Sequence, residues 1–234
     1  MNRSISLILL VFVWISAFAQ DVRTEFIDNL SMVNSHYDNM EQLSVDIEYS
    51  VAERSSGKVV ETSLGFNVKD GENLYRKSSN TEMITNAAYT VIIEHDAKTI
   101  FLMNNDYSGN YKQDDISGSI RQFVDQCSTV RKISSINNCV EYELIIKGQK
   151  YDKIIVELDM TNMYIKRVSM FDNPAFAIDD VNKKITSIKY SNLNKNPDLS
   201  GIDFTFRKHL LQIGNTIKLT NEFSTFTFYD LRTN

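Results

Sequence analysis

The chain has 234 residues, a formal net charge of −5, 42% hydrophobic residues and 24% charged ones. A mildly acidic chain without a Lys/Arg cluster lacks the concentrated positive field that binds nucleic acid or an anionic membrane surface, so neither partner is expected. The length fits one domain with a sizeable core, and no linker divides residues 20–234.

Residues 1–19 have the pattern of a secretory signal peptide. A basic residue near the start precedes an apolar run over residues 5–15, and Ala17 and Ala19 supply the small side chains that a signal peptidase requires. The run is too short to cross a bilayer comfortably, and charged residues follow it closely, so a cleaved signal is favoured over a membrane anchor. We therefore expect export to the periplasm without stable membrane insertion.

After the signal peptide, the spacing between apolar residues changes along the chain. Between residues 22 and 40 apolar residues recur at steps of three and four, which predicts an amphipathic helix. Alternating apolar and polar residues over 43–51 and 60–68, joined by turn residues 55–58, predict a hairpin, and residues 88–104 predict a second one.

The second half of the chain predicts a further helix and more strands. A polar stretch over 104–113 leads into a helix that Ser117 or Ser119 can cap and that runs to about residue 131. Extended segments are expected at residues 140–146, 154–158, 164–171, 184–190, 202–206, 216–220 and 223–229. Because connections of hairpin length cannot form parallel crossovers, we expect an α+β fold: a curved antiparallel sheet of about ten strands covered by the N-terminal helix and the mid-chain helix.

Cys127 and Cys139 are the two cysteines of the chain. In an oxidising compartment, two cysteines this close in sequence favour a disulfide over a metal pair, because no His or third Cys lies near enough to complete a metal site. Such a bond would stabilise the fold by about 3 kcal/mol, and the alternative is two buried thiols.

Motifs for catalysis are missing from the sequence. It contains no G-x-S-x-G, H-E-x-x-H or C-x-x-C pattern and no glycine-rich phosphate loop. The histidines, His36, His95 and His209, have no nucleophile or carboxylate at a diagnostic spacing. The acidic pairs at 114–115 and 179–180 do not reproduce a calcium loop. We therefore expect a protein that is not an enzyme and that holds no metal or cofactor.

Three stretches carry a family resemblance: LGFNVKDGENLYRKSS (64–79), YTVIIEHDAKTIFLMNN (89–105) and MYIKRVSMFDN (163–173). In this order, after a helix and a hairpin, they resemble the LolA-like family of periplasmic lipoprotein carriers over residues 22–206. In that family helices close an incomplete β-barrel, and acyl chains enter the cavity. The resemblance implies a lipid or an acylated lipoprotein as the partner, with transfer to the outer membrane.

LolA-like domains also resemble the N-terminal part of the envelope-stress regulator RseB, so the resemblance implies an alternative role as a sensor or protein-interaction module without transport. Residues 207–234 have no counterpart in the family pattern. We expect these C-terminal strands to extend the sheet or to offer an edge to an envelope protein.

Strand alternation and the resemblance together predict the lining of an apolar cavity. The candidates are Phe26, Leu30 and Val33 on the helix, and Val45, Ile47, Tyr49, Leu64, Phe66, Ile92, Phe101, Val156 and Val168 on strands. Burial of each methylene from water contributes about 0.8 kcal/mol, so a carrier needs apolar area rather than catalytic groups. The same side chains can also pack into a solid core, and the sequence leaves both outcomes open.

Overall fold

The computed structural model describes residues 21–104, 116–176, 183–213 and 216–232. The expected signal peptide, 1–19, and both acidic pairs lie outside these ranges. None of the helices in the described part combines the length and hydrophobicity that a membrane span requires.

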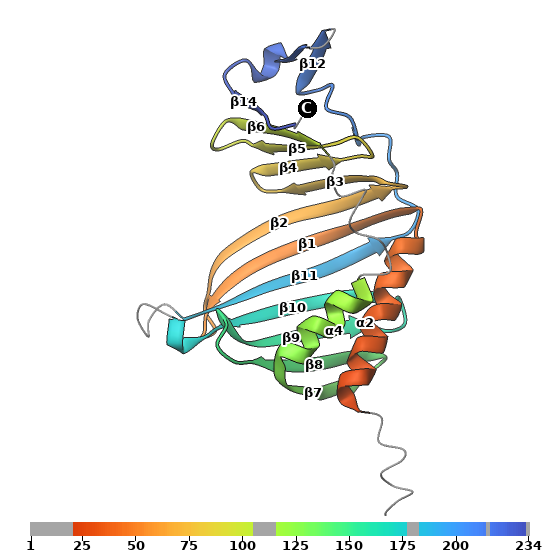
Figure 1. Ribbon diagram of the computed structural model, residues 1–234, viewed down its shortest axis with the longest axis vertical. Helices are drawn as coiled ribbons and strands as arrows, with labels where there is room; N and C mark the ends of the chain where they lie inside the picture. Colours follow the sequence, from red (N-terminus) through yellow and green to blue (C-terminus); the bar gives the residue numbers. More distant parts are fainter. Residues whose placement is uncertain (1–20, 105–115, 177–182, 214–215, 233–234) are drawn as a thin grey trace, which may run out of the picture.

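The fold is dominated by one large, open, curved sheet with two helices across one end of it (Figure 1). In chain order the elements are α2 (Val22–Asn39), β1 (Gln42–Glu53), β2 (Val59–Asp70), β3 (Asn73–Ser78), β4 (Thr81–Thr85), β5 (Tyr89–Glu94), β6 (Thr99–Asn104), α4 (Ile116–Gln126), β7 (Cys127–Ile136), β8 (Cys139–Ile146), β9 (Tyr151–Asp159), β10 (Tyr164–Asp172), the 3-10 helix η2 (Pro174–Phe176), β11 (Lys184–Asn194), β12 (Leu210–Ile213), β13 (Thr216–Leu219), η4 (Asn221–Phe223) and β14 (Thr227–Asp230). Twelve strands form the main sheet in the order β14-β6-β5-β4-β3-β2-β1-β11-β10-β9-β8-β7, and β12 and β13 pair separately.

The α+β class and the two helices are as the sequence predicts, but the expected strand count of about ten is too low. The missed strand β7 follows α4 directly, because the second helix ends at Gln126 rather than near residue 131. Pairing with β8 fixes the chain from Cys127 onward as a strand and overrides the helical spacing that precedes it.

The C-terminal part also differs from the expectation. Residues 202–206 form no strand, because the Asp203 side chain accepts a hydrogen bond from the backbone N–H of Thr205 and closes a turn. Strand β14 pairs with β6 in parallel, so the sheet is not wholly antiparallel. The rule that short, hairpin-length connections exclude parallel pairing does not apply here, because the two strands are far apart in sequence.

The main sheet carries its two hydrophobic cores on opposite faces. The lower core lies under α2 and α4 and includes Phe26, Val124, Cys127, Val140, Tyr142, Leu144, Ile146, Val156 and Leu158. The upper core lies between β4, β5, β6 and the C-terminal segment and includes Ile84, Val91, Ile93, Ile100, Leu102, Phe206, Leu210 and Phe223.

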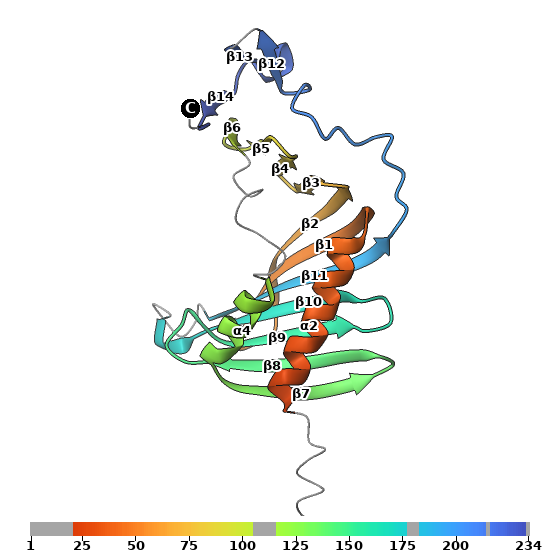
Figure 2. The same cartoon turned by 45° about the vertical axis from the view of Figure 1, so that its right-hand side comes forward.

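Strand pairing establishes that these faces differ, because directly paired residues of a sheet point the same way. The lower-core residue Val156 connects across β10, β11 and β1 to Tyr49. The upper-core residue Ile84 connects across β3 and β2 to Ser44, which is even-numbered on β1 and therefore points away from Tyr49. The strands of the upper end are seen almost end-on in Figure 2 while those of the lower end still cross the view, so the sheet twists strongly between its two cores.

Helix α2 is fastened to the lower half at its N-terminal end. Arg23 donates from Nη1 to the Val124 carbonyl oxygen at 3.2 Å and from Nη2 to the Cys127 carbonyl oxygen at 2.6 Å. The Tyr142 hydroxyl donates to Glu25 at 2.9 Å, and the Phe26 ring meets the Tyr142 ring edge-on with centroids 5.0 Å apart. Phe26 and Tyr142 are 1% and 0% exposed, so this half of α2 covers a filled core and not a cavity.

The predicted disulfide between Cys127 and Cys139 is wrong. Both thiols are free, with Cys127 buried and Cys139 half-buried. The two residues each begin a strand of the β7–β8 hairpin, so antiparallel pairing separates them by the length of that hairpin.

Candidate functional site

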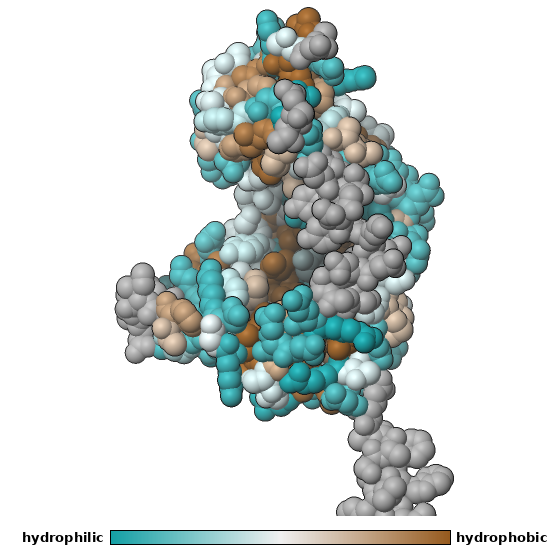
Figure 3. Space-filling model, in the orientation of Figure 1, coloured by the Kyte–Doolittle hydropathy of each residue, from teal (hydrophilic) through white to brown (hydrophobic). Residues whose placement is uncertain are grey.

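A groove crosses the middle of the sheet on the face that carries α2. Two pockets of about 330 and 400 Å³ share Asn67 and Tyr190 and together form it; we call it the central groove. Its apolar and aromatic lining consists of Tyr37, Leu43, Val45, Ile47, Tyr49, Leu64, Leu74, Ile165, Ile188 and Tyr190. Figure 3 shows a hollow at this level, between the two ends of the molecule, with hydrophobic side chains at its base.

The sequence produces this lining because β1 and β11 both alternate. On β1 the residues Val45, Ile47 and Tyr49 share one face, while their neighbours Asp46 and Glu48 point to the other. Tyr190 and Ile188 of β11 lie directly opposite Ile47 and Tyr49, so the two strands build one apolar floor.

The C-terminal end of α2 closes one end of the groove. The Lys69 ammonium donates to the carbonyl oxygens of Tyr37 at 3.0 Å and Asp38 at 3.2 Å, which neutralises part of the helix C-terminus. The Tyr37 hydroxyl accepts a hydrogen bond from the backbone N–H of Ile165 at 3.3 Å, and burial raises the pKa of Tyr37 to about 12. The helix is therefore held at this end too, and the groove is open without any movement of α2.

Gly65 leaves the groove open at its position because it has no side chain. A Cβ atom at this position would lie 2.2 Å from the carbonyl oxygen of Lys77 on β3, so a side chain does not fit. Glycine at this point therefore permits the close approach of β2 and β3 and leaves the groove unobstructed between Ile47 and Ser78.

Leu64 and Phe66 were expected in the cavity; Leu64 borders the groove and Phe66 does not, and strand pairing directs both side chains to the opposite face. They pair with Glu48 and Asp46, whose side chains point away from the groove. The reason is a β-bulge: Val51 pairs with Glu61 and Ala52 with Val59, so Val60 is an extra residue of β2 and the pairing shifts by one residue. A one-residue shift moves every side chain beyond it to the other face.

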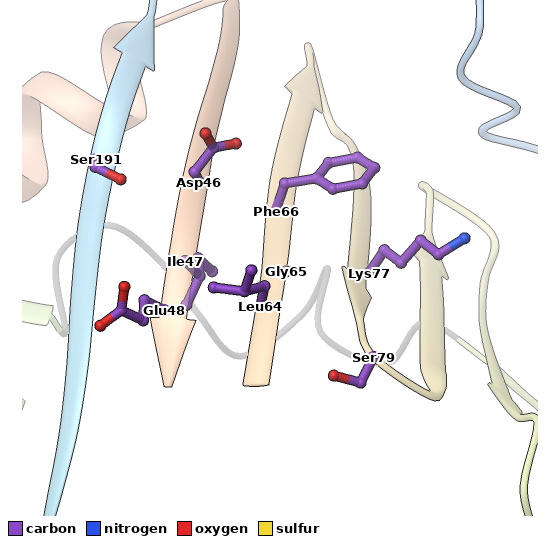
Figure 4. A pocket seen from close by; sticks show the side chains of 9 residues that line it. All are labelled: Asp46, Ile47, Glu48, Leu64, Gly65, Phe66, Lys77, Ser79 and Ser191. Atoms are coloured by element: carbon purple, nitrogen blue, oxygen red, sulfur yellow. The ribbon is translucent and has the colours of Figure 1, made fainter. Parts of the chain in front are cut away.

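These two residues form part of a further, shallow pocket on the outer face (Figure 4). It shares Ile47, Leu64, Gly65 and Lys77 with the lining of the groove. The pocket has a volume of about 400 Å³, and Asp46 and Glu48 stand on one side of it with Lys77 on the other. Leu64 is 66% exposed, so this pocket is an apolar surface patch, not an enclosed site.

The other predicted lining residues fall into three places. Val45, Ile47 and Tyr49 line the central groove. Phe26, Leu30, Val33, Val156 and Val168 lie on the same face toward the lower end: Phe26 and Val156 belong to the lower core, Leu30 packs against it, Val33 is buried, and Val168 is half-buried between Val156 and Ile188. Ile92 and Phe101 share that face at the upper end, where Phe101 stacks on Tyr229 with ring centroids 5.1 Å apart.

The sequence reasoning missed several lining residues: the apolar and aromatic Tyr37, Leu43, Leu74, Ile165, Ile188 and Tyr190, together with Gly65 and the polar Asp38, Glu61, Ser63, Asn67, Lys69, Arg76, Lys77 and Ser78. For Ile188 and Tyr190 the alternation of the predicted strand was the available signal. It became informative only with the knowledge that β11, distant in sequence, pairs with β1.

The histidines lie away from the central groove lining. His95 is 3.1 Å from Glu82 Oε1, and Glu82, which is 5% exposed, also accepts from the Tyr75 hydroxyl at 2.9 Å. His209 is 2% exposed, stacks near Phe223, and has no hydrogen-bond partner for either ring nitrogen within the described ranges. Within the part of the chain that the structure describes, no group of three or more His, Cys, Asp or Glu residues could hold a metal ion.

No protein-family model matches the sequence, and no curated protein matches it. Among solved structures, a DUF1329 family protein from Desulfovibrio piger is 12% identical, with 81% of this chain and 98% of that one covered and a TM-score of 0.38. A LolA superfamily protein from Nitrosomonas europaea is 10% identical, with 69% and 90% covered and a TM-score of 0.28. The MucA/MucB complex of Pseudomonas aeruginosa matches at 10% identity, with 75% and 57% covered and a TM-score of 0.39.

A member of the LolA superfamily, which the sequence resembles, is thus among the structures to which this chain is similar. By its own geometry the chain is an open-sheet α+β module, half-covered by helices, with an apolar groove at the centre of the sheet.

Proposed function

We propose that this chain is a periplasmic binding protein that holds a ligand with a hydrocarbon chain in the central groove. The observation that carries the proposal is the groove itself: apolar and aromatic side chains of β1, β11 and the end of α2 line a continuous hollow that the other described residues leave open. Such a surface is favourable to cover, because apolar area removed from water stabilises by about 25 cal/mol per Å².

Binding of this kind needs no catalytic group and follows chain length. Each further methylene placed in the groove contributes about 0.8 kcal/mol, which is about a fourfold gain in affinity. We therefore expect the affinity of the protein for a series of single-chain amphiphiles to rise with chain length and to level off when the groove is full.

The proposal is tested by a substitution that fills the groove with a large side chain. Ile47→Trp places a large side chain between Tyr190 and Gly65, and we expect it to abolish the binding of a fluorescent fatty acid. Phe66→Trp is the matched control, since Phe66 lies on the neighbouring strand, on the opposite face and outside the lining of the groove. Titrations are compared after circular dichroism has shown both variants to be folded. The proposal is contradicted if wild type and Ile47→Trp bind the fatty acid equally well. It is also contradicted if wild type and both variants bind no amphiphile.

The acyl chains of a lipoprotein are the ligand that the LolA-like resemblance implies, and transport to the outer membrane is the corresponding role. Native mass spectrometry of protein purified from the cell envelope tests this narrower proposal. A bound lipoprotein supports transport, whereas a free lipid in its place supports storage or sensing. Fractionation of cells tests the periplasmic location.

A protein-interaction module is the second candidate, and the exposed Leu64 in the outer pocket favours it. A photo-crosslinking amino acid at position 64 and another at position 47 separate the two functions. Protein adducts at position 64 support interaction, and lipid adducts at position 47 support binding in the groove. Deletion of residues 207–234 is unsuitable for this test, because Leu210 and Phe223 belong to the upper core.

A further inference from the structure

Arg76 is a cation on the apolar face of the central groove. It lies on β3 directly opposite Asn67 of β2, and its Nε donates a hydrogen bond to Asn67 Oδ1 at 3.0 Å. That bond fixes the orientation of the guanidinium and occupies only one of its five N–H donors. Arg76 lines the same pocket as Ile47 and Tyr190.

The charge of Arg76 also acts on the hydroxyl group of Tyr190. Burial raises the pKa of Tyr190, and the positive charge of Arg76 opposes that rise. Arg76 is therefore close enough to the middle of the groove for its charge to act there. Apolar lining continues on both sides, toward Leu43 and Leu74 in one direction and toward Tyr49 and Ile188 in the other.

The charge of Arg76 has no counter-ion among the described residues, since no carboxylate there lies within 4.0 Å of its guanidinium nitrogens. The other cation that lines the α2 end of the groove, Lys69, is already held by the carbonyl oxygens of Tyr37 and Asp38. Glu61, which lines the groove with Arg76, lies six positions along β2 from the partner of Arg76, about 20 Å away. Lys77, which also lines the groove, is paired with Glu82 at 3.3 Å. Arg76 is thus the free cation of the groove among the described residues.

Resting on the proposed function, we infer that the ligand of the central groove carries an anionic group at one end of its hydrocarbon chain and that Arg76 binds that group. A guanidinium matches the planar oxygens of a carboxylate or the oxygens of a phosphate with two parallel hydrogen bonds. A single-chain anionic amphiphile, a fatty acid or a monoacyl phosphate, satisfies both the apolar floor and this donor pair.

The experiment compares three ligands of equal chain length: a long-chain fatty acid, the corresponding alkyl phosphate and the corresponding alcohol. We expect wild-type protein to bind both anions about fivefold more tightly than the alcohol, a modest factor because Arg76 is exposed to solvent. Arg76→Gln should bind all three with the affinity that the alcohol has for wild type. Added salt should reduce the wild-type preference and leave alcohol binding unchanged.

Lys189→Gln is the matched control. It removes one positive charge from β11, but Lys189 pairs with Glu48 on the outer face, so the preference for anions should remain. The tighter of the two anions identifies the carboxylate or the phosphate as the natural group.

Equal binding of all three ligands by wild type overturns the assignment of Arg76 and leaves the apolar groove as a binding site. An anion preference that survives Arg76→Gln also overturns it. Failure of every ligand, the alcohol included, is a failure of the proposed function itself.

Discussion

Cys127 and Cys139 stand at opposite ends of one antiparallel hairpin: Cys127 pairs with Ile146 at the end of β8, and Cys139 pairs with Ile136 at the end of β7. Strands rise about 3.3 Å per residue, so the two Cα atoms are more than about 20 Å apart, whereas a disulfide requires a separation below about 7 Å.

We therefore predict that an exported, oxidised sample contains two free thiols. Cys139 should react with a thiol reagent in the native protein far faster than Cys127, which is 2% exposed. Alkylation followed by mass spectrometry, with and without denaturant, checks both statements. A mass lower by two hydrogens, or an unfolding midpoint that falls on addition of a reductant, would contradict the hairpin arrangement.

Gly65→Ala should destabilise the protein by about 1–3 kcal/mol, because the new Cβ would lie 2.2 Å from the Lys77 carbonyl oxygen and would force β2 and β3 apart. Gly201→Ala is the matched control, since no atom lies within 4 Å of a Cβ built there. Urea unfolding measures both variants. A loss for Gly65→Ala no larger than that of the control is incompatible with the close approach.

Phe26→Ala should cost about 3–5 kcal/mol, because it opens a cavity in the filled lower core. Met32→Ala on the same helix should change the stability by less than about 0.5 kcal/mol, since Met32 is 46% exposed. Chemical denaturation gives both values. Ligand affinity, measured on the folded fraction, should be unchanged in both variants, and a large loss of affinity in Phe26→Ala would show that the ligand reaches under the N-terminal half of α2.

His209 should make the attachment of the C-terminal segment sensitive to acid. Burial lowers the pKa of His209 below 6.5, with Lys208 and His95 adding to the shift and Glu82 and Asp203 opposing it. The folded state therefore favours the neutral ring. Its stabilising contribution is complete above the unfolded pKa and is lost as the pH falls below about 6.5 toward the folded pKa.

Urea midpoints at about pH 7.5 and about pH 5.5 test this sign, and hydrogen exchange of residues 206–226 locates the effect. Because the His209 ring nitrogens have no partners among the described residues, His209→Phe should fold and should lose less stability on acidification than wild type. An unchanged pH dependence in His209→Phe would assign the acid sensitivity to another group.

The predicted residues of β1 share the face of the groove, whereas Leu64 and Phe66 of β2 point to the other face, for one identifiable reason. The pair Ala52–Val59, continued without interruption, would place Ile47 opposite Leu64 and Val45 opposite Phe66, as the alternation of the two strands suggests. The bulge beside Ala52 inserts one residue and places Gly65 and Asn67 in those positions instead. A single extra residue in a strand has no strong sequence signature, so alternation alone could not reveal it.

The sequence by itself determined the local structure: the α2 helix from its three-and-four spacing, most strands from their period of two, and which residues of one strand share a face, because these follow from backbone geometry within a segment. Only the tertiary structure decided how the faces of different strands combine, that β14 joins β6 in parallel, and that the two cores lie on opposite sides of the sheet. Those features depend on register and on contacts between distant segments. The central groove, which requires β1, β2, β11 and the end of α2 together, belongs to this second group.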